Sequence, residues 1–320
     1  VVAGGSYASL SPVSYDSIAD CVLTCEAEYT WREFCEDFRA GRPKPRYQET
    51  GLVAMAESPV PRYDLLKLNR YRSVSVQFSR CSPYRCEFCD IIEMFGRRPR
   101  TKALSQIASE LDLLRKLRVR NAFFVDDNLI GYSPQSKNRT QELFSGMIEG
   151  GLNRKWWMQT SINAITDEHV IELAARAGCI FAFIGFETLS KESLRDMKKG
   201  INIKIGVQNY KKVVNVFHKY GIAVYGAFII GNDHESTAYY KQLARFLVQS
   251  GIDIIQITLL TPLPGTELMS ELQKEGRLLY ADYPQDWDKY RFSYMVHRPQ
   301  DVQPQTIYIG NNYIKKNIYS

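Results

Sequence analysis

The sequence predicts a protein of the α/β class whose main part is a partial (β/α)6 TIM-like barrel. The first observation is that strand-like and helical segments alternate from Ser73 onward in six successive units. Such alternation implies a parallel sheet covered by helices, and six units make about three-quarters of a barrel. The second is that cysteine and polar residues directly follow these strands, where barrel enzymes place their chemistry. The third is the composition, 45% hydrophobic and 24% charged, which is that of a globular chain and excludes global disorder.

The elements of the barrel are expected in a regular order. The strands are short and rich in β-branched or aromatic residues, and they are predicted at Ser73–Phe78, Ala122–Val125, Trp156–Thr160, Ile180–Gly185, Ala223–Ile230 and Ile254–Leu259. The helices have apolar residues three or four positions apart, and they are predicted at Lys102–Arg118, Thr140–Glu149, Asp167–Ala177, Lys191–Met197, Ile205–Tyr220, Ser236–Ser250 and Glu267–Glu275. The acidic pair Asp167-Glu168 marks the beginning of the third helix, because acidic residues favour helix N-termini.

The part before the barrel is expected to be the end of another α/β domain. Val1–Ala3 and Cys21–Leu23 have the character of short strands, and Glu26–Arg39 has aromatic residues at helical spacing. The chain has no initiator Met and begins inside a strand, so we expect a fragment truncated at both ends. Four segments are predicted: a domain remnant at 1–50, a linker at 51–72, the barrel at 73–278 and the start of a C-terminal substrate-side domain at 279–320.

Charge and cysteine content narrow the class of protein. Lys and Arg number 41 against 35 Asp and Glu, a net charge of +6 that is spread along the chain. This excess is too weak to indicate a nucleic-acid partner or an anionic membrane. No apolar run approaches the roughly 18 residues that span a bilayer, and no secretory signal is present. The seven cysteines are odd in number and too sparse for a secreted disulfide framework, so we expect cytoplasmic thiols.

The strongest chemical signal is a cysteine loop. Cys81, Cys86 and Cys89 lie within nine residues, directly after the first predicted strand of the barrel. Three thiolates on one loop can hold a metal ion or an iron–sulfur cluster. A structural zinc needs a fourth ligand, and none of the four histidines is paired at metal spacing: His169, His218, His234 and His297. A four-iron cluster with one open iron is favoured, and a zinc with a distant fourth ligand or a cysteine-rich loop without a metal are the alternatives.

Five motifs together resemble the radical S-adenosylmethionine superfamily, and within it the cobalamin-dependent branch that includes the hopanoid methylases. They are Cys86–Ile91, Phe95–Arg100, Phe123–Asn128, Ile184–Thr188 and Thr261–Thr266. The resemblance covers most of the chain. The Gly4-Gly5 pair and the helix after Glu26 resemble the end of that branch's Rossmann-like cobalamin-binding domain. The loop whose His ligates cobalt in that branch would lie upstream of Val1.

The resemblance implies three cofactors and a set of site residues. The cofactors are a [4Fe-4S] cluster on Cys81, Cys86 and Cys89, S-adenosylmethionine chelated by its open iron and, in the full-length parent, cobalamin. By position in the motifs, the implied contacts are Phe88 at the adenine, Asp126, Asp127 and Asn128 at the methionine ammonium, and Glu187 at the ribose or carboxylate. By position in the predicted strands, the resemblance also implies Gly226 and Ile229 of the fifth strand at the adenine and Ser161 after the third strand at the ribose or carboxylate. Gly4 and Gly5 are implied in the cobalamin-binding part. Each of these residues also has a structural alternative, such as loop packing, a turn cap or a buried strand.

One departure from the family pattern affects the cluster. The family spacing is C-x3-C-x2-C, which places the first ligand at position 82, but that position is Ser82. Cys81 stands beside it, where the family usually has Gly, and gives C-x4-C-x2-C. We predict that Cys81 is the ligand, because a loop can absorb a one-residue shift that a strand cannot. The alternative is a defective cluster. The nearby Arg97, Arg98 and Arg100 form a predicted basic patch, either for an anionic ligand or for solvent.

The predicted function is reductive cleavage of S-adenosylmethionine to a 5′-deoxyadenosyl radical, for cobalamin-dependent methylation of an unactivated carbon. The alternatives are a radical cyclisation or rearrangement without methyl transfer, and a non-catalytic zinc or cluster-free binding protein. The expected partners are a small-molecule substrate, which can be lipid-like, and an electron donor such as a flavodoxin or ferredoxin. No nucleic-acid partner and no transmembrane segment are expected.

Overall fold

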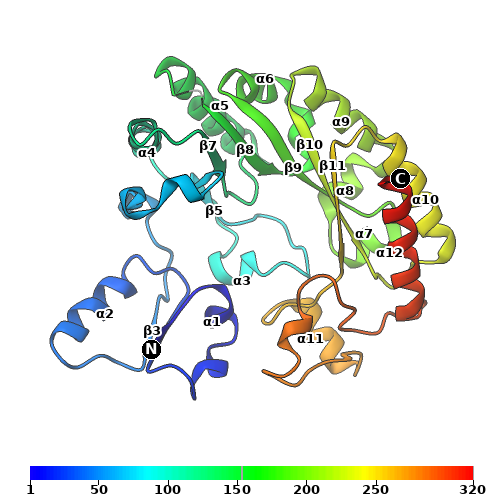
Figure 1. The fold of residues 1–320 in the computed structure, drawn as a ribbon, viewed down its shortest axis with the longest axis horizontal. Helices are drawn as coiled ribbons and strands as arrows, with labels where there is room; N and C mark the ends of the chain where they lie inside the picture. The colour runs from blue at the N-terminus through cyan, green and yellow to red at the C-terminus, as the bar shows by residue number, and fades with distance from the viewer. Residues whose placement is uncertain (153, 320) are drawn as a thin grey trace. The chain divides into compact units, whose positions relative to one another are not determined.

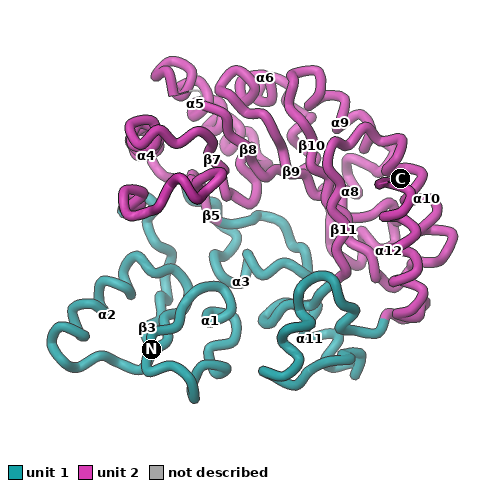
Figure 2. Tube along the Cα trace, in the orientation of Figure 1, with its two compact units in different colours: residues 1–59, 81–101, 261–298 teal, residues 60–80, 102–260, 299–320 magenta. Residues whose placement is uncertain are grey.

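The computed structural model describes residues 1–152 and 154–319 and divides the chain into two compact units (Figure 2). Unit 1 comprises residues 1–59, 81–101 and 261–298. Unit 2 comprises residues 60–80, 102–260 and 299–320. Each unit is therefore assembled from three separate stretches of the chain. The cysteine loop falls in unit 1, and the strands of the predicted barrel fall in unit 2.

Unit 2 is built on a parallel sheet of six strands in the order β11-β10-β9-β8-β7-β4. The strands are β4 (Val74–Val76), β7 (Asn121–Phe124), β8 (Lys155–Thr160), β9 (Cys179–Glu187), β10 (Ala223–Ile230) and β11 (Ile254–Leu259). Each strand pairs in parallel with its sequence neighbours in this sheet. The predicted α/β class with a parallel sheet is confirmed.

Helices follow the strands of unit 2 along the arc of the sheet (Figure 1). They are α4 (Leu104–Lys116), α5 (Pro134–Glu149), α6 (Glu168–Arg176), α7 (Lys191–Asp196), α8 (Gly200–Ile205), α9 (Tyr210–Lys219), α10 (Thr237–Gln249) and α12 (Pro304–Ile318). Helix α5 begins six residues before its predicted start, because Ser133 caps it and Pro134 occupies its first turn. The helix predicted over 205–220 begins only at Tyr210, as α9, because α8, which was not predicted, ends at Ile205 and Gly206 has φ 85°.

The core of unit 2 lies between the sheet and these helices. Phe124 and Phe144 both contact the ring of Trp156, with ring centroids 5.1 and 5.2 Å away. Farther along the sheet, Phe186 of β9 and Phe228 of β10 stack at 5.5 Å. All five rings are at most 1% exposed. Truncating such a ring to alanine typically costs about 3–5 kcal/mol, so these contacts contribute strongly to the stability of unit 2.

Unit 1 contains a second, smaller parallel sheet in the order β1-β2-β3. Its elements are β1 (Val2–Ala3), α1 (Ser6–Leu10), β2 (Cys21–Thr24), α2 (Thr30–Arg39) and β3 (Arg46–Gln48). Helix α2 packs Phe34 against Leu23 and Tyr47 of the sheet. The predicted α/β remnant is thus a Rossmann-like parallel sheet. Strand β3 was not predicted, because three residues are too few to show a period of two.

The other stretches of unit 1 contain α3 (Ile91–Phe95), β6 (Arg100–Thr101) and α11 (Glu267–Lys274). The N-terminal and C-terminal stretches meet here, since the ring of Tyr7 lies 5.6 Å from Tyr283 and 4.2 Å from Trp287. The remaining short elements of the two units are η1 (Pro12–Tyr15), η2 (Met55–Glu57), η3 (Tyr63–Leu65), η4 (Leu68–Arg70), β5 (Ser79–Arg80), η5 (Ile162–Thr166), η6 (Val207–Asn209) and η7 (Trp287–Lys289). The predicted domain boundaries at 50, 72 and 278 stay predictions. None of the described helices is both long and apolar enough for a membrane span.

Candidate functional site

The cysteine loop of unit 1 is irregular and largely buried. Cys81 and Cys86 are each 6% exposed, and Cys89 is half-buried. The amide of Cys89 donates to the carbonyl of Cys86 at 3.2 Å, which closes a turn around Glu87 and Phe88. Phe88 is half-buried. The turn places Cys86 and Cys89 at its two ends.

Cys81 has an unusual backbone conformation. Its φ is 100°, in the left-handed region that glycine adopts freely and other residues rarely adopt. This is the position at which the family usually has Gly. A non-glycine residue in such a conformation costs about 1–3 kcal/mol, and residues that tolerate this cost cluster at functional sites.

The donor set of the loop fits iron–sulfur chemistry, because it consists of soft thiols close in sequence. Within residues 1–152 and 154–319, no three His, Cys, Asp or Glu side chains are arranged to hold a single metal ion. No disulfide is formed among the seven cysteines, all of which are described. The assignment of Cys81, Cys86 and Cys89 as ligands stays a prediction.

In unit 2, Asp126 follows β7 and has no exposed surface. Its carboxylate accepts hydrogen bonds from the amide of Phe78 at 3.0 Å, from the hydroxyl of Ser79 at 2.6 Å and from the amide of Ser79. These bonds tie the chain after β7 to the chain after β4. Burial raises the pKa of Asp126 to about 6, although the hydrogen bonds act in the opposite direction. Asp127 is half-buried.

Asn128 connects the end of β7 to the end of β8. Its side-chain oxygen accepts from the hydroxyl of Thr160 at 3.1 Å and from the amide of Ser161 at 3.2 Å. Its side-chain nitrogen is buried and has no hydrogen-bond partner in the described part of the chain. A buried donor without an acceptor costs about 1–3 kcal/mol, unless a ligand supplies the acceptor. The structure therefore brings Asn128 and Ser161 together and leaves one side-chain donor of Asn128 for an oxygen of a ligand.

Glu187 is the last residue of β9 and is 6% exposed. Its carboxylate pairs with the ammonium of Lys199 at 2.6 Å. The carboxylate folds back over Gly185, where an added Cβ would lie 2.3 Å from its Oε1 atom. Asn202 supports the same turn by donating to the carbonyls of Gly185 and Phe186 at 3.2 and 3.0 Å. Lys199 and Asn202 were missed from the sequence, because they lie in a short segment without a recognisable motif.

Gly226 and Ile229 lie on opposite faces of β10, since side chains alternate along a strand. Gly226 faces the helix side, where an added Cβ would lie 2.9 Å from Ile252. Ile229 is half-buried on the other face. A ligand that contacts the Ile229 side chain would meet only the backbone of Gly226. In unit 1, Gly4 and Gly5 precede α1, and Gly5 has φ 97°.

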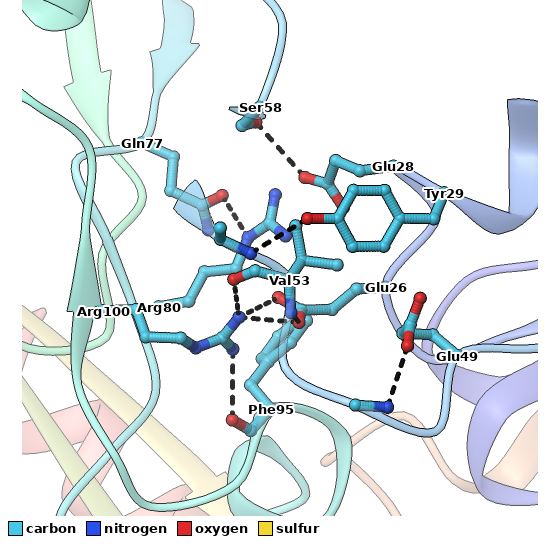
Figure 3. A network of polar contacts seen from close by, with 12 residues as sticks. Glu26, Glu28, Tyr29, Glu49, Val53, Ser58, Gln77, Arg80, Phe95 and Arg100 are labelled. Atoms are coloured by element: carbon cyan, nitrogen blue, oxygen red, sulfur yellow. Dashed lines mark hydrogen bonds and ion pairs between the residues drawn. The ribbon is translucent and has the colours of Figure 1, made fainter. Parts of the chain in front are cut away.

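The predicted basic patch is divided by an ion pair within unit 1 (Figure 3). Arg97 and Arg98 are exposed. Arg100 instead donates to both carboxylate oxygens of Glu26, at 2.7 and 3.0 Å, and to the carbonyl of Val53 at 2.7 Å. The side chains of Arg100 and Glu26 are only 12% and 2% exposed. Arg100 therefore links the 81–101 stretch of unit 1 to Glu26 and Val53 of its N-terminal stretch, and it does not belong to an exposed patch.

A parallel α/β fold with three thiols on one loop defines a class of candidate iron–sulfur proteins. The model of the Radical SAM superfamily matches residues 76–247, which is more than half of the chain. The chain therefore belongs to the radical SAM superfamily.

The curated relatives include methyltransferases. The chain is 34% identical to an uncharacterized methyltransferase of Synechocystis, over 87% of this chain and 52% of that protein. It is 33% identical to the hopanoid C-2 methylase of Rhodopseudomonas palustris, over 70% of this chain and 42% of that protein. It is 29% identical to a bacteriochlorophyllide d C-12(1)-methyltransferase of Chlorobaculum tepidum, over 98% of this chain and 67% of that protein. The chain thus spans about half the length of the first two relatives.

Two solved structures share the fold. The methyltransferase TsrM from Kitasatospora setae, with cobalamin and a [4Fe-4S] cluster bound, has a TM-score of 0.75 at 15% identity over 88% of this chain and 59% of that one. The cobalamin-dependent radical enzyme OxsB, with aqua-cobalamin bound, has a TM-score of 0.76 at 18% identity over 99% of this chain and 54% of that one. At these identities the likeness concerns the fold alone.

Proposed function

We propose that this chain is the radical part of an enzyme that reductively cleaves S-adenosylmethionine and methylates an unactivated carbon with the help of cobalamin. The observation that carries the proposal is the 34% identity to an uncharacterized methyltransferase over 87% of this chain, together with the 33% identity to a hopanoid methylase over 70% of it. The three-cysteine loop of unit 1 supports it, since its thiols suit an iron–sulfur cluster. In this proposal the parallel sheet of unit 2 is a partial barrel of six β/α units.

Cys81, Cys86 and Cys89 would hold a [4Fe-4S] cluster. When bound, the cluster supplies the electron that cleaves S-adenosylmethionine to methionine and a 5′-deoxyadenosyl radical. The protein's task is then to bind and orient the cofactor and to exclude water. Phe88 would pack beside the adenine, because it lies in the turn between two ligands.

The ends of β7, β8 and β9 would orient S-adenosylmethionine. The unpartnered side-chain nitrogen of Asn128 offers a donor to a carboxylate or ribose oxygen. The carboxylate of Asp126 accepts from the amide of Phe78 and the hydroxyl of Ser79 and has no exposed surface, so we assign the contact with the methionine ammonium to the half-buried Asp127. Glu187, held by Lys199, would accept from a ribose hydroxyl or the ammonium. Ser161 and Ile229 would complete the contacts.

The N-terminal sheet of unit 1 would belong to a cobalamin-binding domain, with Gly4 and Gly5 allowing a close approach of the backbone. Two proteins with the same fold, TsrM and OxsB, have structures with cobalamin bound. The hopanoid methylase relative suggests a lipid-like substrate for this chain. A flavodoxin or ferredoxin would supply the electron.

The test is anaerobic reconstitution with iron and sulfide, followed by reduction in the presence of S-adenosylmethionine. We expect about four irons per chain and the release of 5′-deoxyadenosine. The Cys86→Ala variant should lose both, whereas Cys179→Ala, which removes a buried thiol of β9, should lose neither. A reconstituted chain that binds S-adenosylmethionine but releases no 5′-deoxyadenosine would refute the proposal.

A further inference from the structure

A pocket of about 620 Å³ lies entirely within unit 2. It is lined by residues of two segments, 68–74 and 117–121. These segments lead into β4 and β7, which are paired neighbours in the sheet. The pocket is therefore at the amino ends of the two strands, whereas Asp126 and Asn128 follow the carboxyl end of β7. Its volume is in the range of small-molecule sites, about 300–1,000 Å³.

The charged residues that line the pocket are all basic. Arg72, Arg118 and Arg120 are exposed, and the lining contains no acidic residue. None of these three arginines forms an ion pair within residues 1–152 and 154–319. The carboxylate of Asp112, on the preceding helix, is already bound by Arg115 and Lys116. The lining therefore has three positive charges and no negative charge to balance them.

Arg118 adds an independent observation. It follows α4 at φ 57°, and the amide of Val119 donates back to the carbonyl of Leu114 at 3.0 Å. This is the helix ending in which the left-handed position is usually glycine. An arginine adopts this conformation at a cost that glycine avoids. A cation is favoured at the carboxyl end of a helix, and at this position the same guanidinium also lines the pocket, where an anion would be its counter-charge.

The walls also indicate the kind of anion. Guanidinium groups bind phosphate oxygens through paired hydrogen bonds. Tyr71 is 55% exposed beside Arg72 and offers a ring face for an apolar or aromatic group. We propose that this pocket binds a small organic phosphate of the nucleotide type, with its phosphates on Arg118 and Arg120 and its ring on Tyr71. The site is separate from the residues assigned above to S-adenosylmethionine, and it does not depend on the proposed function.

The experiment is calorimetric titration of the full chain with ADP, inorganic phosphate and adenosine at constant ionic strength. We expect ADP to bind most tightly, phosphate more weakly and adenosine not measurably. Arg118→Gly and Arg120→Gln should each weaken ADP binding about tenfold, because each removes a charge-assisted contact. Tyr71→Ala should weaken ADP binding and leave phosphate binding unchanged. Thermal unfolding shows that the variants fold, and Arg118→Gly should be at least as stable as the wild type because glycine suits φ 57°.

Arg176→Gln is the matched control, since Arg176 is an exposed arginine in the last turn of α6 and lies outside the pocket. It removes the same charge and should leave ADP binding unchanged. The proposal fails if Arg176→Gln weakens ADP binding as much as Arg118→Gly does, because the loss of affinity would then come from the change in the net charge of the protein and not from a contact in the pocket. It also fails if ADP does not bind at millimolar concentration, if phosphate alone binds as tightly as ADP, or if a single-stranded oligonucleotide displaces ADP at far lower concentration.

Discussion

The backbone conformation of Cys81 predicts that glycine is more stable than alanine at position 81 but less stable than alanine at position 86 of the same loop. At Cys81, φ is 100°, a conformation that costs an L-residue about 1–3 kcal/mol and costs glycine nothing comparable. At Cys86 the backbone has an ordinary negative φ, because Cys86 is not among the described residues with positive φ. There glycine should be worse than alanine by about 0.4–1 kcal/mol, since it has more freedom to lose on folding.

We therefore expect Cys81→Gly to be more stable than Cys81→Ala by about 1 kcal/mol, and Cys86→Gly to be less stable than Cys86→Ala by about 0.5 kcal/mol. The measurement is urea unfolding of the four iron-free variants under reducing conditions, with the free energy of unfolding taken from each curve. Both variants at one position lack the thiol, so the difference between their free energies of unfolding does not include the effect of losing the sulfur. If alanine is the more stable residue at both positions, the strain at Cys81 is not real.

The same variants test the ligand assignment. If the strain at Cys81 is tolerated because its thiol binds iron, Cys81→Gly should reduce the iron content after reconstitution to near zero. The double variant Cys81→Gly/Ser82→Cys restores the family spacing and should recover about four irons per chain. A Cys81→Gly variant that retains its full iron content would show that Cys81 is not a ligand.

Three further predictions concern unit 2. Lys199→Met leaves the buried carboxylate of Glu187 without its partner and should lower the free energy of unfolding in urea by about 3 kcal/mol. The double variant Lys199→Met/Glu187→Gln should recover most of this loss. Equal losses in the single and double variants would contradict the ion-pair argument. Gly185→Ala places a Cβ 2.3 Å from the Glu187 carboxylate and should cost about 1–3 kcal/mol in the same assay, whereas a change near zero would show that the carboxylate moves freely. Burial raises the pKa of Asp126 from 3.8 to about 6. Between these two pH values the folded chain keeps a proton that the unfolded chain has released. The free energy of unfolding should therefore fall by on the order of 3 kcal/mol as the pH rises from about 4 to 6. Asp126→Asn should flatten that decline, and an undiminished decline in the variant would exclude Asp126 as its source.

The sequence predicted the strands of unit 2 well, because continuous β-branched runs bounded by glycine and polar residues are a local signal. Ala223–Ile230 and Ile254–Leu259 have the predicted bounds in β10 and β11. The helix predicted over 205–220 was wrong at Gly206, since a periodic apolar pattern continues across a residue whose φ of 85° interrupts the helix. Helix α12 was missed, because residues 304–318 were interpreted as the start of a C-terminal domain.

The sequence could predict the candidate site residues only where a recognisable motif follows the carboxyl end of a strand. Asn128 and Ser161 lie at the ends of β7 and β8, and parallel strands bring such ends to one edge. Lys199 lies twelve positions from Glu187, and this pairing depends on how the chain returns after α7. Arg100 was grouped with Arg97 and Arg98 by sequence proximity, but it pairs with Glu26, 74 positions away. Contacts at such separations depend on the three-dimensional fold and leave no local pattern.

The division of each unit among three stretches of chain has a consequence for biosynthesis. The chain passes from one unit to the other after residues 59, 80, 101, 260 and 298. Unit 1 lacks one of its three parts until residue 298 has left the ribosome, although its sheet comes from a stretch that precedes the other two parts in the sequence. The cysteine loop, at 81–101, belongs to this late-completed unit. Its thiols are therefore synthesised long before the structure that buries Cys81 and Cys86 is complete. We therefore expect that those thiols must stay reduced, and apart from other metals, at least until residue 298 has been added.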